Sequence, residues 1–98
     1  MIDLDTPIFL ARKARLVRDP RSGKDILLYP ERGLELGETA ARIARLCDRG
    51  LTAAAIVDEL SATYAGAPRA RIEADVVDFL RALDERGLLA RAGEAVPP

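Results

Sequence analysis

The spacing of apolar residues changes near residue 37 of this 98-residue chain. Before that point they occur in short runs separated by turn residues, which is the pattern of β-strands. After it they recur every three or four residues, which is the pattern of amphipathic helices. A chain of this length forms one small domain. We therefore expect a single domain in which a small sheet comes first and a helical part follows.

Three short strands are expected before residue 37. Residues 14–18 mix apolar and basic side chains, and residues 25–29 form a continuous apolar run, as in a strand that is buried on both faces. Residues 19–23 lie between them and contain Pro and Gly, which favour a tight turn. Residues 30–33 form a second turn, and residues 34–36 alternate apolar and charged side chains. Short strands joined by tight turns predict an antiparallel meander.

Three helices are expected after residue 37. The first spans residues 38–48 and is followed by Gly50, a residue that suits the cap of a helix C-terminus. Thr52 is a suitable N-cap for the second helix. The third helix spans about residues 69–86. Its apolar stripe consists of Ile72, Val76, Phe79 and Leu83. The predicted fold class is α+β and winged helix-turn-helix-like, with a three-stranded antiparallel meander followed by three helices.

The two ends of the chain differ in composition from the middle. Residues 1–11 are expected to form a flexible N-terminal arm with an apolar tip that packs onto the body, and residues 92–98 a tail or linker. The domain then occupies residues 12–91, where Leu88 and Leu89 either pack back or add a short strand. No apolar run approaches the ~18 residues of a membrane span, and no secretory signal is visible. A cytoplasmic location is the expectation.

The composition excludes most kinds of catalytic site. The chain has no His and a single cysteine, Cys47, so the commonest general base and an internal disulfide are both absent. Cys47 lies on the apolar side of the first helix, which favours a buried structural thiol over a reactive one. The glycines have neither the dinucleotide nor the P-loop spacing. We expect a domain that is not an enzyme and holds no metal or cofactor.

Basic residues are concentrated in the first predicted hairpin. Residues 12–24 contain six basic residues and one acid, although the formal net charge of the chain is −1. They form either a solvated edge strand or a docking surface for an acidic partner. The residues that would dock electrostatically are Arg12, Lys13, Arg15 and Arg18. A winged-helix DNA-binding regulator is the alternative function, but residues 69–86, its recognition helix, carry five acids and four arginines. Because phosphates dominate affinity for DNA, this charge disfavours nucleic acid as a partner.

A groove for a peptide is the third hypothesis from the residues. Residues 34–36 end the meander, so their outer side is expected to be an unpaired edge, which is a template for another strand. Val77 lies to one side of the stripe of the third helix, and this side could form the second wall. The helix residues placed on that side by their angle are Glu73, Val77, Leu80, Arg81 and Asp84. The alternative interpretation is a wide apolar stripe without a groove.

Two longer segments carry a family resemblance. Residues 29–48 are YPERGLELGETAARIARLCD and residues 71–89 are RIEADVVDFLRALDERGLL. Together with LARKARLVRDPRSGKDILL before them, they resemble the PqqD family of pyrroloquinoline quinone (PQQ) biosynthesis over about residues 8–90. The Tyr-Pro-Glu-x-Gly turn, the Leu-x-Leu strand before Glu-Thr-Ala and the Leu-Cys-Asp helix end are specific in combination.

The resemblance implies a winged-helix-like RiPP recognition element, a domain that captures the leader part of a ribosomally made precursor peptide. In this family the precursor is PqqA, and the complex is presented to the radical SAM enzyme PqqE. The domain itself holds no cofactor and makes no bond, and some members are fused ahead of PqqC. Related elements bind the peptide as an added strand between the third strand and the third helix. The strand wall here would be Gly33, Leu34, Glu35 and Leu36.

Overall fold

The structure is a computed structural model that describes residues 4–30 and 32–91. A three-stranded antiparallel sheet is followed by three helices, and the described residues also form a two-stranded sheet. The elements in chain order are β1 (Ile8–Leu10), β2 (Arg15–Arg18), β3 (Asp25–Tyr29), β4 (Arg32–Leu36), α1 (Glu38–Cys47), α2 (Ala53–Thr63), α3 (Arg69–Glu85) and β5 (Leu89–Arg91). The expected α+β, winged-helix-like order of elements is confirmed. Among the described residues no helix combines the length and apolar character needed to cross a bilayer.

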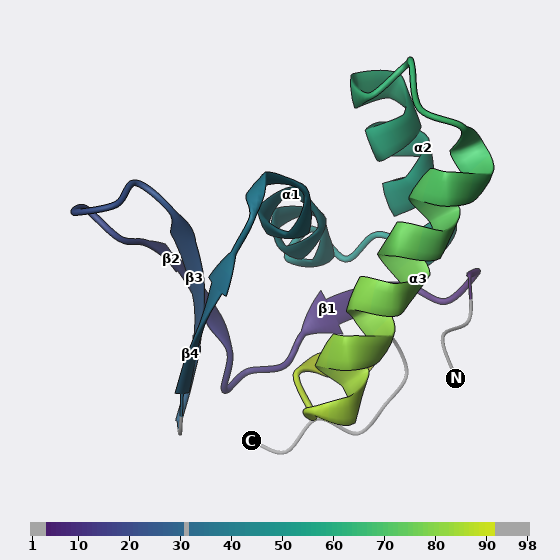
Figure 1. Cartoon of the computed structure of the whole chain (residues 1–98). Coiled ribbons are helices and arrows are strands. Elements are labelled where there is room, and N and C mark those ends of the chain that lie inside the picture. The colour runs from purple at the N-terminus through teal and green to yellow at the C-terminus, as the bar shows by residue number, and fades with distance from the viewer. Residues whose placement is uncertain (1–3, 31, 92–98) are drawn as a thin grey trace.

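The larger sheet has the strand order β2-β3-β4. Only one of its faces is turned toward the helices (Figure 1). Leu16, Leu27 and Leu34 are aligned across its three strands and form part of that inner face. Leu27 is fully buried, whereas Leu28 on the outer face is 37% exposed. The expectation that residues 25–29 are buried on both faces is therefore wrong, because no described helix covers the outer face.

A second, two-stranded sheet holds part of the N-terminal segment. β1 pairs antiparallel with β5, and Ile8 is buried. The backbone N–H of Ile8 also donates to the carbonyl oxygen of Leu51, with a distance of 3.1 Å between the atoms. The arm expected over residues 1–11 thus contains a strand that packs on the body. Both alternatives for Leu88 and Leu89 are confirmed, since the two residues are buried and β5 begins at Leu89. Residues 1–3 and the expected tail 92–98 lie outside the described residues.

Threonine and glycine cap two of the helix ends, and the cap at Thr52 is the one that the sequence predicts. The side chain of Thr52 accepts a hydrogen bond of 3.0 Å from the N–H of Ala55 and so satisfies a free donor at the start of α2. Gly87 follows α3 with a φ of +70°, a conformation that glycine adopts without a steric penalty. The N–H of Leu88 then donates to the carbonyl of Leu83 at 2.9 Å. This Schellman-type end turns the chain back toward β1, where β5 pairs.

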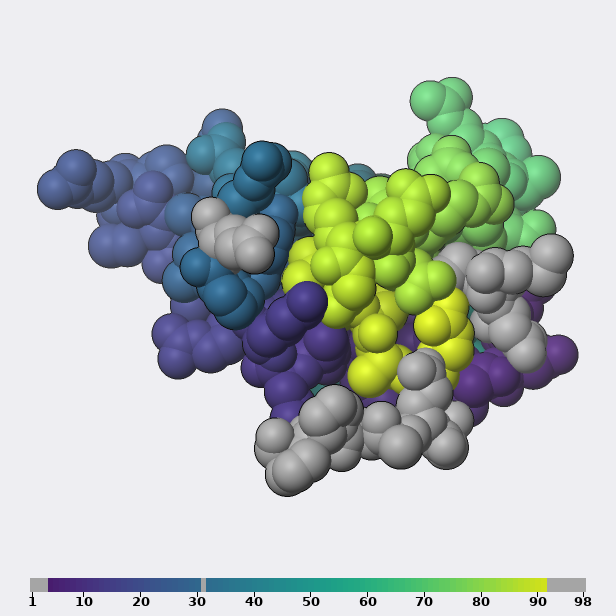
Figure 2. Space-filling model, turned by 90° about the horizontal axis from the view of Figure 1, so that it is seen from below, coloured from purple at the N-terminus to yellow at the C-terminus, as the bar shows by residue number. Residues whose placement is uncertain are grey.

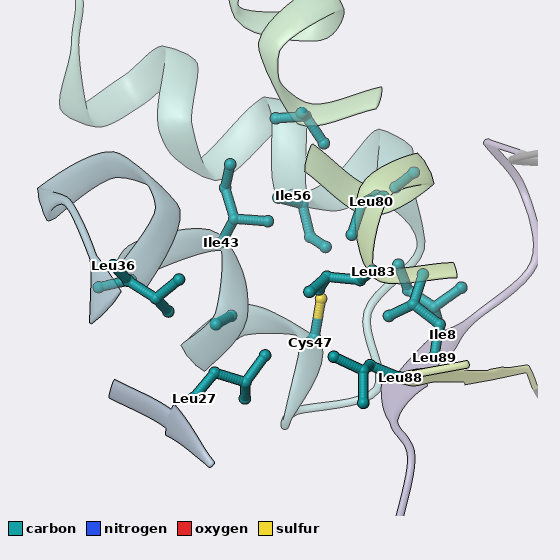
Figure 3. Packing of buried hydrophobic residues seen from close by; sticks show 14 of the residues in the cluster. Ile8, Leu27, Leu36, Ile43, Cys47, Ile56, Leu80, Leu83, Leu88 and Leu89 are labelled. Atoms are coloured by element: carbon teal, nitrogen blue, oxygen red, sulfur yellow. The ribbon is translucent and has the colours of Figure 1, made fainter. Parts of the chain in front are cut away.

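The core lies where the inner face of the sheet, the helices and the small sheet meet (Figure 3). It is aliphatic, and none of its buried residues is polar or charged. The largest fully buried side chains come from β1, β3, all three helices and the turn before β5: Ile8, Leu27, Ile43, Cys47, Ile56, Val57, Val76, Leu80, Leu83 and Leu88. Because every element contributes to one cluster, the described residues form a single domain.

The buried stripe of α3 differs from the predicted one at a single position. Ile72, Val76, Leu80 and Leu83 are buried, whereas Phe79 is only half-buried. Leu80 and Phe79 are adjacent in sequence, so they lie about 100° apart around the helix. The centre of the buried stripe is therefore shifted toward Leu80. This shift changes which side chains lie on either flank of the helix.

Cys47 is a buried structural thiol, as predicted. Burial raises the pKa of Cys47 from 9.0 to about 12, and the negative charge of Asp48 adds a smaller rise. The folded state thus favours the protonated thiol, so its contribution to stability is complete below pH 9 and is lost as the pH rises toward 12.

We expect the variant Cys47→Ala to lose less stability than the wild type over this alkaline interval. Urea denaturation on either side of pH 9 measures the difference. The cavity left by the substitution lowers stability at every pH, so only the slope with pH is informative. Equal slopes for the two proteins would contradict the prediction.

Candidate functional site

The free edge of β4 is the main feature of the site. β4 is the last strand of the sheet order and pairs only with β3 within the described part of the chain. Its pairing with β3 begins at Tyr29 and Arg32, which are separated by a two-residue turn. Hydrogen-bonded pairs alternate along an antiparallel ladder and start at such a turn. Gly33 and Glu35 therefore direct their N–H and C=O groups away from β3, toward the free edge.

The side chains of β4 alternate between the two faces of the sheet. Leu36 is buried and Leu34 is half-buried on the inner face, while Gly33 and Glu35 are exposed on the outer face. The carboxylate of Glu35 accepts a hydrogen bond from Nζ of Lys24 at 3.1 Å. All four residues predicted for the strand wall thus lie on one edge strand with free backbone groups.

Helix α3 lies beside this edge without closing it. α1 packs against β4, while α3 packs against α2 and β5. In Figure 1, α1, β4 and β1 lie to the left of α3, while the chain before β1 passes to its right. Seen from below, the surfaces of β4 and of the C-terminal half of α3 lie next to each other (Figure 2). The two elements therefore border the same face of the molecule.

The predicted helix wall is on the flank of α3 that faces away from β4. Glu73 and Val77 line a depression of about 450 Å³ together with Leu4 of the N-terminal segment. The carboxylate of Asp84 accepts two hydrogen bonds from the guanidinium of Arg91 in β5, with distances of 3.0 and 2.8 Å. These hydrogen bonds lower the pKa of Asp84. The side of the helix that carries Glu73, Val77 and Asp84 thus faces the N-terminal segment and β5.

The remaining two residues of the predicted wall are one buried and one exposed side chain. Leu80 is fully buried, so its assignment to a groove wall is wrong. Arg81 is exposed, and its Nη1 is 3.9 Å from the carboxylate of Asp78 on the same helix. The predicted stripe contained Phe79, whereas the structure buries Leu80 in its place, so the buried face of the helix is turned toward the side of Leu80.

The flank of α3 opposite Val77 carries Phe79. Phe79 follows Val77 by two residues, or about 200° around the helix, and so lies on nearly the opposite side. It is half-buried and packs against the edge of the core, and Ala82 follows it one turn later, also half-buried. An aromatic residue at the border of a stripe, followed by a small residue, was the only sequence signal for this flank.

The basic residues of the first hairpin do not form one patch. Arg15 is exposed on the outer face of the sheet, in register with Leu28. Arg18 is 3.7 Å from the carboxylate of Asp25. Lys13 is exposed and its ammonium lies close to Gly87, at the C-terminal end of α3. Arg12 is exposed as well. These positive charges therefore face different directions.

A charged depression of about 430 Å³ lies between the β2–β3 hairpin and the start of α1. Asp25 is 2.7 Å from Nη1 of Arg45 in α1 and also contacts Arg18. Arg42 is 3.5 Å from Glu38 in the first turn of α1. The lining has four basic side chains and three carboxylates, and each basic group contacts one of these carboxylates, so none of them is left unpaired in the depression. Within the residues that the structure describes, no cluster of acidic, His or Cys side chains could hold a metal ion.

Comparisons with known proteins agree on one family. The profile of the family described as "Coenzyme PQQ synthesis protein D (PqqD)" matches residues 26–89. The chain is 42% identical over 88 residues to the PqqA binding protein of Rhodopseudomonas palustris, an alignment that covers 90% of this chain and 85% of that protein. It is 37% identical over 82 residues to the bifunctional coenzyme PQQ synthesis protein C/D of Methylorubrum extorquens, of which it covers 22%.

Two solved structures have the same fold. The solution structure of the PqqD truncation of Methylobacterium extorquens PqqCD, described as a stand-alone RiPP recognition element, has a TM-score of 0.77 and 33% identity and covers 93% of this chain and 96% of that one. TbiB1 in complex with the TbiA(beta) leader peptide has a TM-score of 0.72 and 27% identity and covers 89% of this chain and 98% of that one.

The chain shares its winged-helix-like fold with a structure described as a RiPP recognition element, which places it in that class of proteins. The extent of the sequence match then identifies the member of the class. The chain belongs to the PqqD family.

Proposed function

We propose that this domain binds the precursor peptide PqqA as a strand added along β4, between β4 and α3, and presents it to the radical SAM enzyme PqqE. The observation that carries the proposal is the free edge of β4, where Gly33 and Glu35 direct their backbone groups outward. The name of the relative from Rhodopseudomonas palustris and the leader-peptide complex of TbiB1 support it.

Strand addition explains how a small domain can hold a peptide without an enclosed pocket. Backbone hydrogen bonds to β4 give affinity that tolerates sequence variation, while side-chain contacts give selectivity. The inner side chains of the added strand would meet Leu34, Leu36 and the flank of α3 that carries Phe79. Ordering a disordered peptide offsets several kcal/mol of this contact energy. A moderate affinity therefore follows, which suits a chaperone that must release its peptide.

Presentation to PqqE would raise the effective concentration of the peptide at the active site of the enzyme. A peptide held on the domain meets the active site of a bound enzyme as a nearly intramolecular partner. The domain needs no catalytic group of its own for this purpose. The C/D protein of Methylorubrum extorquens carries a matching segment within a longer chain, which supports a role as a module that works beside enzymes of the same pathway. Docking of PqqE through Arg12, Lys13, Arg15 or Arg18 stays a prediction.

Replacement of Phe79 by Ala tests the helix wall. We expect it to weaken the affinity for PqqA about fivefold or more, because truncating a central aromatic contact typically costs more than 1 kcal/mol. Val77→Ala is the matched control on the opposite flank, and its affinity should stay close to that of the wild type. Isothermal titration calorimetry measures both affinities, and thermal melts check that both variants are folded.

An amide NMR titration of the wild type with PqqA tests the proposal as a whole. The amides of Gly33–Leu36 and of the C-terminal half of α3 should shift. A stronger effect of Val77→Ala than of Phe79→Ala would instead support the wall predicted from helical angles. Shifts with duplex DNA but none with PqqA would favour the DNA-binding alternative.

A further inference from the structure

Gly33 lies at the free edge of the sheet, on the outer face that no described helix covers. In register it is aligned with Leu28 of β3 and Arg15 of β2. The neighbouring row on the same face is formed by Glu35, Ile26 and Val17. The outer face therefore has apolar residues in its middle strand and a residue without a side chain at its edge.

The side chains of Ile26 and Leu28 lean over Gly33. A Cβ atom at Gly33 would lie 3.2 Å from Cγ2 of Ile26 and 3.2 Å from Cδ2 of Leu28, which is tighter than ordinary van der Waals contact. The two methyl groups can thus reach the edge strand because Gly33 has no side chain to occupy that space. Leu28 remains 37% exposed, so this apolar surface is open to solvent. Arg15, which flanks it, is exposed too.

A strand added along β4 would place side chains on this outer face as well as on the side that faces α3. Side chains alternate between the faces, so the residue opposite Gly33 points outward, next to Ile26 and Leu28. Same-face neighbours on paired strands contact each other, and a large side chain commonly covers a glycine across an edge. The next outward position, opposite Glu35, would meet the ion pair of Glu35 and Lys24 instead.

We infer that the domain has a second, outer-face subsite, formed by Ile26 and Leu28 over Gly33, that selects a large aliphatic or aromatic side chain of the bound peptide. The inference rests on the proposed strand addition to β4 and adds a specificity-determining contact to it. The bound peptide is then recognised on both of its faces, with one apolar residue on the solvent side.

The experiment uses synthetic PqqA of Rhodopseudomonas palustris, the species of a relative that is 42% identical to this chain. Leu28→Ser should weaken its binding about two- to fivefold, the range expected for one cross-strand pair. Val17→Ser is the matched control, since Val17 lies on the same face but on β2, at the far side of the sheet. Its affinity should equal that of the wild type.

Methyl NMR provides a readout that does not depend on stability. The methyl groups of Ile26 and Leu28 should shift on titration and show contacts to a peptide side chain, while those of Val17 should not. Shifts of the β4 amides with unchanged Ile26 and Leu28 methyls, together with wild-type affinity of Leu28→Ser, would overturn the subsite and leave the proposed function standing. A wild type whose β4 amides do not respond to PqqA would overturn both.

Discussion

Replacement of Glu35 by Pro is expected to lower the affinity for PqqA by at least about tenfold. Proline removes the backbone N–H that Glu35 directs to the free edge, and its ring obstructs an approaching strand. The loss leaves a carbonyl of the bound peptide without a partner, which costs roughly 1–3 kcal/mol. The ladder between β3 and β4 keeps its hydrogen bonds, because Glu35 lies in a pair that makes none. Calorimetric titration with PqqA measures the change.

Arg18→Pro is the matched control for this variant. Arg18 is exposed on β2, at the opposite edge of the same sheet, and by the same alternation its N–H points away from β3. Both variants lose one ion-pair partner, since Arg18 contacts Asp25 and Glu35 contacts Lys24. If the peptide adds to β4, only Glu35→Pro weakens binding. A folded Glu35→Pro variant with wild-type affinity would refute strand addition at this edge.

The second large effect concerns stability. Leu27→Ala should lower the free energy of unfolding by about 2–5 kcal/mol, the range for a fully buried leucine that leaves a cavity. Leu27 is completely buried at the centre of the inner face of the sheet. For a domain of this size such a loss is a large fraction of the total stability. Urea denaturation measures it.

The adjacent residue provides the control. Leu28 lies on the outer face and is 37% exposed, so Leu28→Ala should lower the free energy of unfolding by about 1 kcal/mol or less. The two variants remove the same atoms from neighbouring positions of one strand. Similar losses for both would mean that the outer face is covered in solution, which would contradict an open sheet face.

The edge strand proposed as one wall of the site was predictable from the sequence, but the flank of α3 proposed as the other wall was not. A meander of three strands must end in an edge strand, and residues 34–36 are last in chain order. The flank of α3 depends on two facts that periodicity does not contain: the exact centre of the buried stripe, and the side on which β1 and β5 pack. A rotation of the buried stripe by a fraction of a turn decides whether Leu80 or Phe79 is buried, and in the structure Leu80 is buried and Phe79 is half-buried.

The open outer face shows the same distinction. A run such as Asp-Ile-Leu-Leu-Tyr is apolar on both sides, and apolar content alone indicates burial on both. Only the placement of the helices shows that Leu27 is covered and Leu28 is not. The apolar residues of the outer face then have a use beyond packing, which is the contact proposed here for the bound peptide.

By itself the sequence determined the order of the three strands and three helices, the aliphatic core, the cap at Thr52 and the family, because these depend on neighbouring residues and on local spacing. Tertiary structure alone decided that β1 pairs with β5, which flank of α3 faces β4 and which face of the sheet stays open. These features arise from contacts between segments far apart in the chain. Such contacts leave no periodic signal in the sequence. Packing between distant segments depends on how their surfaces fit together and on which surfaces other elements already cover.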